Sequence, residues 1–257
     1  MNDREYNALD GIRRSDLWVI KQSPMHFRYH MDHPETDSPS LTFGRAMHKY
    51  ILEPETFNEE FAIAPIVDRR TKDGKLEYAD FLNTLGGREV IAFEDMERIG
   101  DMRRSLMQNS EVVDIMQNIT SVETPFIWTD AKTGERCKVK TDMIVEINGM
   151  PYIVDYKTTT SCADGAFERS VRKYGYDFQS GMYSEGVEIS TLEAHGFIFI
   201  AQEKDAPYAS RVYYCDDYFI EKGRNEFHDL LNIYHECKQT GDWYGYESRE
   251  LYAEDWN

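Results

Sequence analysis

Apolar positions follow one period in the first half of the chain and another in the second half. Up to about residue 120 they recur every three or four residues, which is the spacing of amphipathic helices. Helices are therefore predicted over 15–23, about 42–52, 88–109 and 110–118. Ser15 or Asp16 is expected to cap the first of these helices, which ends before Pro24. The polar, glycine-containing stretch 62–88 is expected to be an exposed loop joined to a helix.

Beyond residue 120 the pattern becomes β-rich. Strands are predicted for "SVETPFIWTD", "RCKVKTDMIVEI" and "PYIVDYKTT", which turn signals at 130–135 and 148–149 separate. The elements predicted after them are a helical stretch over 164–188, strands over 194–203 and 210–216, a helix over 217–241, and an aromatic, acidic tail over 242–257. This order predicts an α/β or α+β fold. We expect one domain over 1–257, made of a mainly helical part (1–120), a sheet with a helix (121–215), and a C-terminal helix with the tail (216–257).

The composition is that of a globular protein, with 41% hydrophobic and 13% aromatic residues in a chain of 257. No apolar run approaches the roughly 20 residues of a membrane span, and the N-terminus lacks the apolar segment of a signal peptide. A cytoplasmic protein without a membrane partner is therefore expected. The four cysteines lie far apart, so we expect reduced thiols and no zinc or iron–sulfur cluster.

The net charge of −18 argues against a protein that coats nucleic acid through bulk electrostatic attraction. The acidic excess is unevenly distributed, because residues 1–52 contain equal numbers of basic and acidic side chains. All of the excess negative charge therefore comes from residues 53–257. The sequence leaves open whether the N-terminal part has a locally positive face.

The dipeptide Asn148-Gly149 between two apolar runs predicts a tight β-hairpin with a type I′ turn. Counting outward from this turn pairs Ile147 with Met150 and, further along, places Asp142 opposite Asp155. Residues opposite each other on neighbouring strands have Cβ atoms about 5 Å apart. Two carboxylates are therefore predicted to face each other on strands that the apolar pattern marks as buried.

Opposed like charges destabilise a hairpin unless a shared proton or a bound cation compensates them. Lys157 shares the face of Asp155, because side chains two apart on a strand point the same way. Carboxylate ligands favour a hard ion such as Mg²⁺ or Mn²⁺. An alternative reading is an ordinary cross-strand ion pair between Asp142 and Lys157, with Asp155 paired elsewhere. Both readings stay open at this point.

These residues also carry a resemblance to a known family. Asp142, followed by "VDYKT" with Asp155-x-Lys157, resembles the PD-(D/E)xK nuclease motif. Gln179 and Tyr183 in "DFQSGMYSEG" are similar to the QxxxY motif of the RecB-like branch. His48 in "FGRAMHKYIL" and the opening "SDLWVIKQSPMHFRY" match the N-terminal helices of that branch.

Together the elements resemble the RecE (exonuclease VIII) nuclease domain and its phage relatives, over approximately residues 5–240. One departure is that Thr141, rather than proline, precedes the first acid. The chain also lacks the cysteine cluster of the iron–sulfur nucleases in this branch. The resemblance implies a restriction-endonuclease-like core, in which helices flank a central mixed sheet behind an N-terminal helical region.

The resemblance implies an Mg²⁺-dependent exodeoxyribonuclease, with Mn²⁺ as a substitute. It would degrade linear duplex DNA from 5′ to 3′ and leave 3′ single strands for recombination by strand annealing. Asp142, Asp155 and the Tyr156 backbone carbonyl would hold the metal, and His48 would complete or border its ligand sphere. Lys157 would orient a water or offset charge on the phosphate.

Further residues have more open roles. Glu123, on the preceding strand, is either another metal ligand or a solvated strand-end acid. Gln179 and Tyr183 share one helix face, and they either bridge the lysine and the DNA backbone or simply pack together. Arg45, three residues before His48, either binds a terminal phosphate or is a surface arginine. The histidines without a partner at ligand spacing, for which no metal role is expected, are His26, His30, His33, His195, His228 and His235.

The resemblance also implies partners. Double-stranded DNA ends would be the substrate, a homo-oligomeric ring (trimer or tetramer) would gather cations around the DNA, and a single-strand annealing protein would receive the product. Two other functions remain: an endonuclease or nickase on the same fold, and an acidic DNA mimic or scaffold without catalysis.

Overall fold

The computed structural model describes residues 3–33 and 38–250. The first part of the described chain is mainly helical, as predicted. Its elements are α1 (Asp3–Ala8), α2 (Arg14–Ile20), α3 (Pro24–Asp32), α4 (Pro39–Leu52), the 3₁₀ turn η1 (Pro54–Thr56), α5 (Phe57–Glu60), β1 (Phe61–Ile63), α6 (Lys72–Asn83), β2 (Glu89–Ile91), α7 (Phe93–Leu106) and α8 (Ser110–Gln117). The expected tail 242–257 is described only as far as residue 250, and 251–257 lie outside the described residues.

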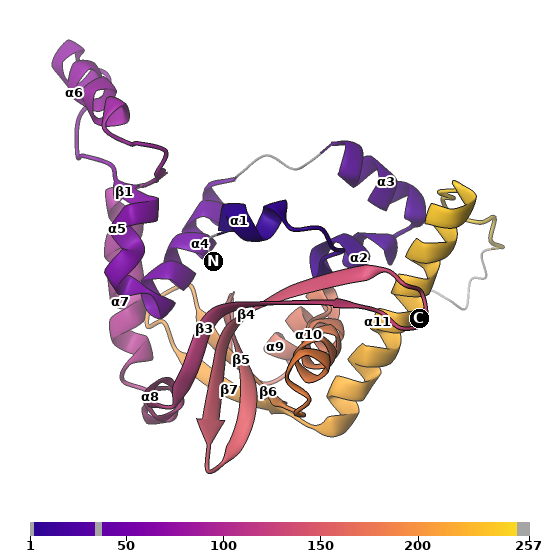
Figure 1. Cartoon of the computed structure of the whole chain (residues 1–257). Coiled ribbons are helices and arrows are strands. Elements are labelled where there is room, and N and C mark those ends of the chain that lie inside the picture. Colours follow the sequence, from indigo (N-terminus) through magenta and orange to yellow (C-terminus); the bar gives the residue numbers. More distant parts are fainter. Residues whose placement is uncertain (1–2, 34–37, 251–257) are drawn as a thin grey trace.

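The second part forms a sheet with crossing helices. Its elements are β3 (Ile119–Thr129), β4 (Arg136–Ile147), β5 (Met150–Thr159), α9 (Ala166–Tyr174), α10 (Tyr176–Thr191), β6 (Gly196–Glu203), β7 (Ser210–Cys215) and α11 (Asp217–Thr240). The strand order is β3-β4-β5-β6-β7, with β5 and β6 parallel and the other neighbours antiparallel. The sheet is therefore mixed, and helices lie on both of its sides (Figure 1).

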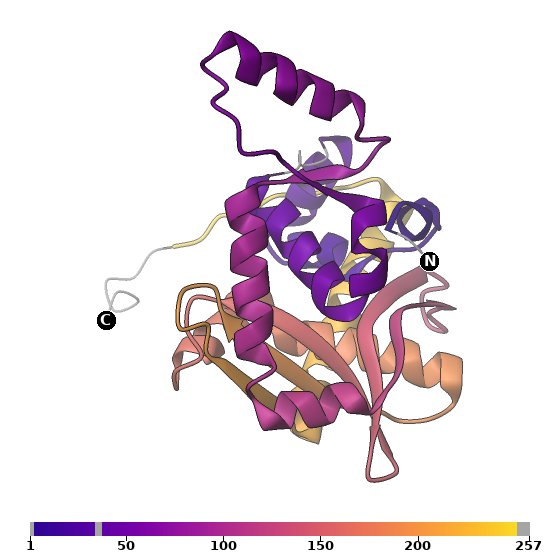
Figure 2. The same cartoon turned by 90° about the vertical axis from the view of Figure 1, so that its left-hand side faces the viewer.

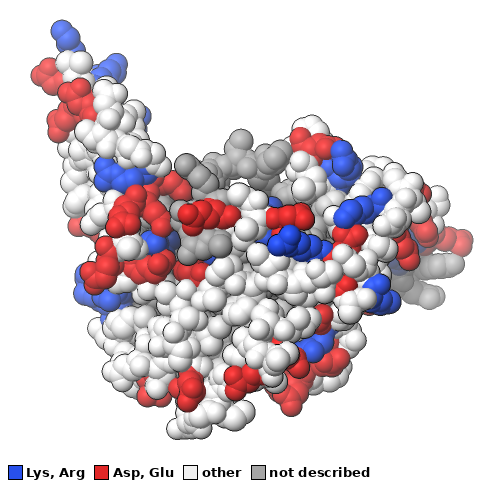
Figure 3. All heavy atoms as spheres, viewed as in Figure 1, with Lys and Arg blue, Asp and Glu red and all other residues white. Residues whose placement is uncertain are grey.

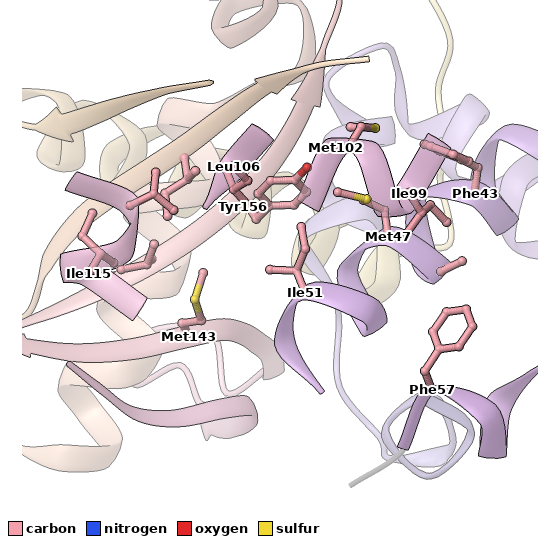
Figure 4. Packing of buried hydrophobic residues seen from close by; sticks show 14 of the residues in the cluster. Phe43, Met47, Ile51, Phe57, Ile99, Met102, Leu106, Ile115, Met143 and Tyr156 are labelled. Atoms are coloured by element: carbon pink, nitrogen blue, oxygen red, sulfur yellow. The ribbon is translucent and has the colours of Figure 1, made fainter. Parts of the chain in front are cut away.

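One face of the sheet packs against the N-terminal helices. Met143, Val154 and Tyr156 belong to a buried cluster on this side, together with Met47 of α4 and Met102 of α7. Figure 4 shows Tyr156 and Met143 of the sheet beside these helices. A buried hydrogen bond of 2.6 Å from the Tyr156 hydroxyl to Gln202 Oε1 fixes the ring. Gln202 Nε2 in turn donates to the Met102 carbonyl at 2.8 Å, which ties α7 to the sheet.

The opposite face is covered by α9, α10 and α11. Phe178 and Met182 of α10 are fully buried against Val139 of β4. α10 and α11 pack closely because each contributes a glycine at the contact. A Cβ at Gly181 would lie 2.0 Å from the Arg224 nitrogen, and one at Gly223 would lie 1.8 Å from the Asp177 carbonyl oxygen. The position of α10 over the sheet is thus set by backbone contact.

Tertiary structure changes several predicted boundaries. Pro24 begins a new helix, α3, because proline is well tolerated in the first turn. The predicted helical stretch 164–188 is divided at Gly175, whose φ of +63° ends α9 and starts α10. Residues 89–91 form β2, which pairs in parallel with β1, before α7 begins. Beyond this pair, α6 projects from the body of the molecule (Figures 1 and 2).

Candidate active site

The predicted hairpin register is confirmed. β4 and β5 pair from Ile147↔Met150 to Met143↔Val154, and both turn residues have positive φ, 53° at Asn148 and 76° at Gly149. These angles fit a type I′ turn. Asp142 and Asp155 are the next residues beyond the last pair.

The paired backbone of the hairpin ends at Met143, and at Asp142 a side-chain hydrogen bond joins the two strands instead. The Tyr156 N–H donates to Asp142 Oδ2 at 2.9 Å. The Asp142 side chain is thereby fixed against β5 next to Asp155. Burial, together with the nearby Asp155 charge, raises the pKa of Asp142 to about 7. The predicted conflict between the two carboxylates is therefore present in the folded chain.

A third acid extends the row. β3 pairs with β4 through Val122↔Met143 and Thr124↔Thr141, so Glu123 lies between these pairs, beside Asp142. Glu123 has a φ of +48°, and its carboxylate forms an ion pair with Lys140. Burial and the Asp142 charge raise the pKa of Glu123. Three neighbouring strands thus each contribute one carboxylate.

Asp155 is the most deeply buried of the three acids, with a side chain that is 3% exposed. Gln179 Nε2 of α10 donates to its Oδ1 at 2.5 Å, and Lys157 Nζ lies 2.6 Å from its Oδ2. The alternative reading, an ion pair between Asp142 and Lys157, is therefore wrong, since Lys157 pairs with Asp155 on its own strand. The contact of Oδ2 with Lys157 lacks the alignment of a hydrogen bond, and this buried oxygen accepts none from the described residues.

His48 reaches the acids from α4. Its Nδ1 lies 3.4 Å from Asp142 Oδ2, and its ring packs edge-on against Tyr156 at 5.3 Å. Burial lowers the pKa of His48, and the charge of Lys157 lowers it further. The imidazole is therefore neutral at neutral pH, which is the form that binds a metal.

Tyr183 and Arg45 occupy different surroundings. Tyr183 follows Gln179 by one helical turn and lies partly buried among the apolar residues under the sheet. Burial and the Asp155 charge raise its pKa well above 10. Arg45 lies on α4, where its Nε donates to Glu89 of β2 at 3.1 Å. A phosphate-binding role for Arg45 stays a prediction.

Arg14 was not singled out by the sequence, yet it lies beside these residues. Its guanidinium donates to the Gly175 carbonyl at 3.0 Å and to the Tyr174 carbonyl. Burial lowers its pKa, against the opposing effect of Tyr183 and Asp155. No spacing in the sequence connects α2 with the junction of α9 and α10, so only the fold could reveal this contact.

The donor set suits a divalent cation. Two aspartates and a glutamate offer the oxygen ligands that hard ions prefer, and the neutral His48 adds a nitrogen. The raised pKa of Asp142 shows negative charge that the protein itself leaves incompletely compensated. Asp155 Oδ2 accepts no hydrogen bond from the described residues, so its charge is balanced by the ion pair with Lys157. A cation among these groups would relieve that repulsion.

The mixed sheet between two helical layers, with the acid of β4 beside Asp155-x-Lys157 of β5, defines a PD-(D/E)xK fold. The chain belongs to the family described as a PDDEXK-like domain of unknown function (DUF3799), whose pattern matches residues 15–251.

Comparison with solved structures agrees at the level of the fold. A crystal structure from Eubacterium rectale, whose name reads "Putative exonuclease", matches with a TM-score of 0.61 at 14% identity, covering 99% of this chain and 97% of that one. A structure named SSO0001 matches with a TM-score of 0.32 at 14% identity, covering 75% and 86%, which is too weak to support an argument. No curated protein matches the sequence. Among the described helices, none is both long and apolar enough to cross a membrane.

Proposed function

We propose that this chain is a divalent-metal-dependent nuclease that hydrolyses DNA phosphodiesters. The observation that carries the proposal is the row of Glu123, Asp142 and Asp155 on three adjacent strands, with Lys157 at its end. A divalent ion held there, Mg²⁺ or Mn²⁺, would polarise a phosphate and lower the pKa of a bound water. Membership of a PD-(D/E)xK-like family supports this reading.

The chain's own residues have separable tasks in this proposal. Asp142 and Asp155 bind the cation, together with the Tyr156 carbonyl, while Glu123 and His48 border it. Gln179 orients Asp155 through its 2.5 Å hydrogen bond. Lys157, whose side chain is 20% exposed at the edge of the site, stabilises negative charge that develops on the phosphate.

Helix α9 offers a cationic path for the DNA backbone beside this site. Arg169, Arg172 and Lys173 are exposed and form no ion pair with the described residues. α9 ends at the junction with α10, where Lys157 Nζ lies 5.1 Å from the Tyr176 ring centroid. In contrast, acidic side chains gather at the base of the projecting α6 segment (Figure 3). A local cationic helix explains how a chain with net charge −18 can bind DNA near its catalytic residues.

Further parts of the proposal rest on the resemblance to RecE. The chain would act as one nuclease domain on duplex ends, from 5′ to 3′, and leave 3′ overhangs for an annealing protein. A homo-oligomeric ring would retain the DNA, and analytical ultracentrifugation checks this assembly. A monomer at micromolar concentration, with and without DNA, would contradict the ring.

Cleavage assays on linear and covalently closed circular duplexes, with Mg²⁺ and with Mn²⁺, test the activity. We expect degradation of the linear DNA alone, and a loss of at least a hundredfold in rate for Lys157→Ala. Lys132→Ala, at an exposed lysine in the β3–β4 turn, is the matched control and should retain wild-type rates. Cutting of closed circles would favour an endonuclease or nickase, and no cutting of either substrate would favour a non-catalytic acidic protein.

The DNA path has its own test. The double variant R172E/K173E should weaken duplex binding about tenfold or more and reduce the salt dependence of the affinity. K72E/K75E makes the same charge change on the projecting helix α6 and serves as the control. Equal losses in the two variants would show that general charge, rather than α9, governs binding.

A further inference from the structure

A second cluster of ligating side chains lies away from the proposed nuclease site. Asp130 at the end of β3, Glu185 of α10 and His228 of α11 each place one ligand atom within 4.8 Å of the other two. Glu185 follows Gln179 by six residues, so the two side chains point about 120° apart around α10. The cluster therefore joins a different side of α10 to α11 and to the β3–β4 turn.

The hydrogen bonds of Asp130 leave one of its oxygens free to bind. Oδ2 accepts from the Thr133 N–H and hydroxyl, both at 2.7 Å, and from the Lys132 N–H at 3.1 Å. Oδ1 instead faces His228 Nδ1 at 3.8 Å, which is too long for a hydrogen bond. Ligands that share one Zn²⁺ ion lie about 3 to 3.5 Å apart, given metal–ligand bonds of about 2.1 Å. The gap is thus slightly wider than a shared metal requires.

The two ring nitrogens of His228 face different carboxylates. His228 Nε2 lies 2.9 Å from Glu185 Oε2, a distance at which its N–H donates to the carboxylate. In the neutral ring, Nδ1 then presents a lone pair to Asp130 Oδ1. Two acceptors that face each other need a cation between them, either a second proton on the ring or a metal ion.

Negative charge in this cluster is energetically costly because its two carboxylates are buried. The side chains of Asp130 and Glu185 are 6% and 9% exposed, whereas His228 is 37% exposed. Arg224 Nε is 4.0 Å from Glu185, and its guanidinium forms the closer contact, 2.9 Å, with Glu188. Hydrogen bonds from Thr133 and Lys132 compensate part of the Asp130 charge, whereas Glu185 depends mainly on the imidazole at the rim, which also leaves a route for an ion to enter.

We propose that Asp130 Oδ1 and His228 Nδ1 bind a divalent transition-metal ion of the Zn²⁺ class, separate from the nuclease site, while Glu185 accepts the Nε2–H and holds the imidazole in that tautomer. A histidine nitrogen beside carboxylates suits such an ion better than Mg²⁺. The ion would tie the β3–β4 turn to α10 and α11, and would stabilise the packing that positions Gln179.

Calorimetric Zn²⁺ titration of an Asp155→Asn protein, in which the nuclease site is weakened, tests this site. We expect one remaining Zn²⁺ site, with affinity reduced at least tenfold by adding His228→Ala. His235→Ala is the matched control, because His235 lies two turns further along α11 and contacts Glu135 together with Lys238. Zn²⁺ should raise the melting temperature of the control and leave that of the His228 variant unchanged.

Two outcomes would overturn the proposal. Equal Zn²⁺ affinity in the His228 and His235 variants would place the ion elsewhere. A Zn²⁺-independent melting temperature in the Asp155→Asn protein would mean that a protonated His228 alone compensates the acids. Should His228→Ala fail to fold, His228→Gln and Asp130→Asn supply the same comparison. Mg²⁺-dependent DNA cleavage is a separate readout, so failure of the nuclease proposal would leave this result interpretable.

Discussion

Replacing Asp142 by asparagine should stabilise the metal-free protein. The pKa of Asp142 is raised to about 7 from an ordinary value of 3.8, because burial and Asp155 both disfavour the carboxylate. That difference corresponds to about 4 kcal/mol at 1.36 kcal/mol per pH unit. The side chain is 15% exposed, so water relieves part of this term, and we expect a gain of about 2 to 4 kcal/mol. Asparagine keeps an oxygen that can accept the Tyr156 N–H.

The effect should depend on pH in a defined direction. The folded protein binds the Asp142 proton more tightly than the unfolded chain does, so the unfavourable term is absent below about pH 4. It grows as the pH rises and is complete above about pH 8. The stability difference between the Asp142→Asn variant and the wild type should therefore be largest at pH 8 and small at pH 4.5.

Urea denaturation at pH 8 and pH 4.5, in EDTA and in Mn²⁺, measures these differences. Mn²⁺ should stabilise the wild type and have a much smaller effect on the variant, because one ligand is missing. Glu146→Gln, at an exposed acid of the same strand, controls for loss of a negative charge and should change stability by less than about 0.5 kcal/mol. An Asp142→Asn protein less stable than the wild type at pH 8 in EDTA would refute the reasoning.

Three further changes test the scaffold. Gly223→Ala should destabilise the protein by about 3 kcal/mol or more in urea denaturation, since its Cβ would lie 1.8 Å from the Asp177 carbonyl oxygen; a loss below 1 kcal/mol would contradict the close helix contact. Gly149→Ala, at a φ of +76°, should cost about 1 kcal/mol by the same measurement, and a stabilised variant would argue against the type I′ turn. Gln202→Met should cost about 2 to 4 kcal/mol, since it leaves the buried Tyr156 hydroxyl without its partner, and a melting temperature within 1 °C of the wild type would exclude this role.

The sequence by itself determined the central hairpin. Asn148-Gly149 sets the turn, and the turn sets the register, because both depend on residues close together in the chain. The approach of Asp142 to Asp155 follows from that register, and alternating apolar residues indicated which strands would be buried. The order of helices and strands was predicted for the same reason, since helix and strand periods are local properties. The mixed sheet with flanking helices, which the family resemblance implied, is confirmed.

Only the tertiary structure decided which distant groups meet the hairpin. Lys157 pairs with Asp155 rather than Asp142, and Arg14 lies at the α9–α10 junction. His48, which the family resemblance had indicated, approaches Asp142 from α4. These contacts depend on how helices pack on the sheet, which is set by backbone contacts such as the one at Gly223.

The same holds for His228, which has no ligand partner at short spacing in the sequence. It meets Asp130 and Glu185 because three separate elements converge there. Short-range patterns fix local geometry, whereas long-range contacts follow from shape and packing that no short stretch of sequence contains.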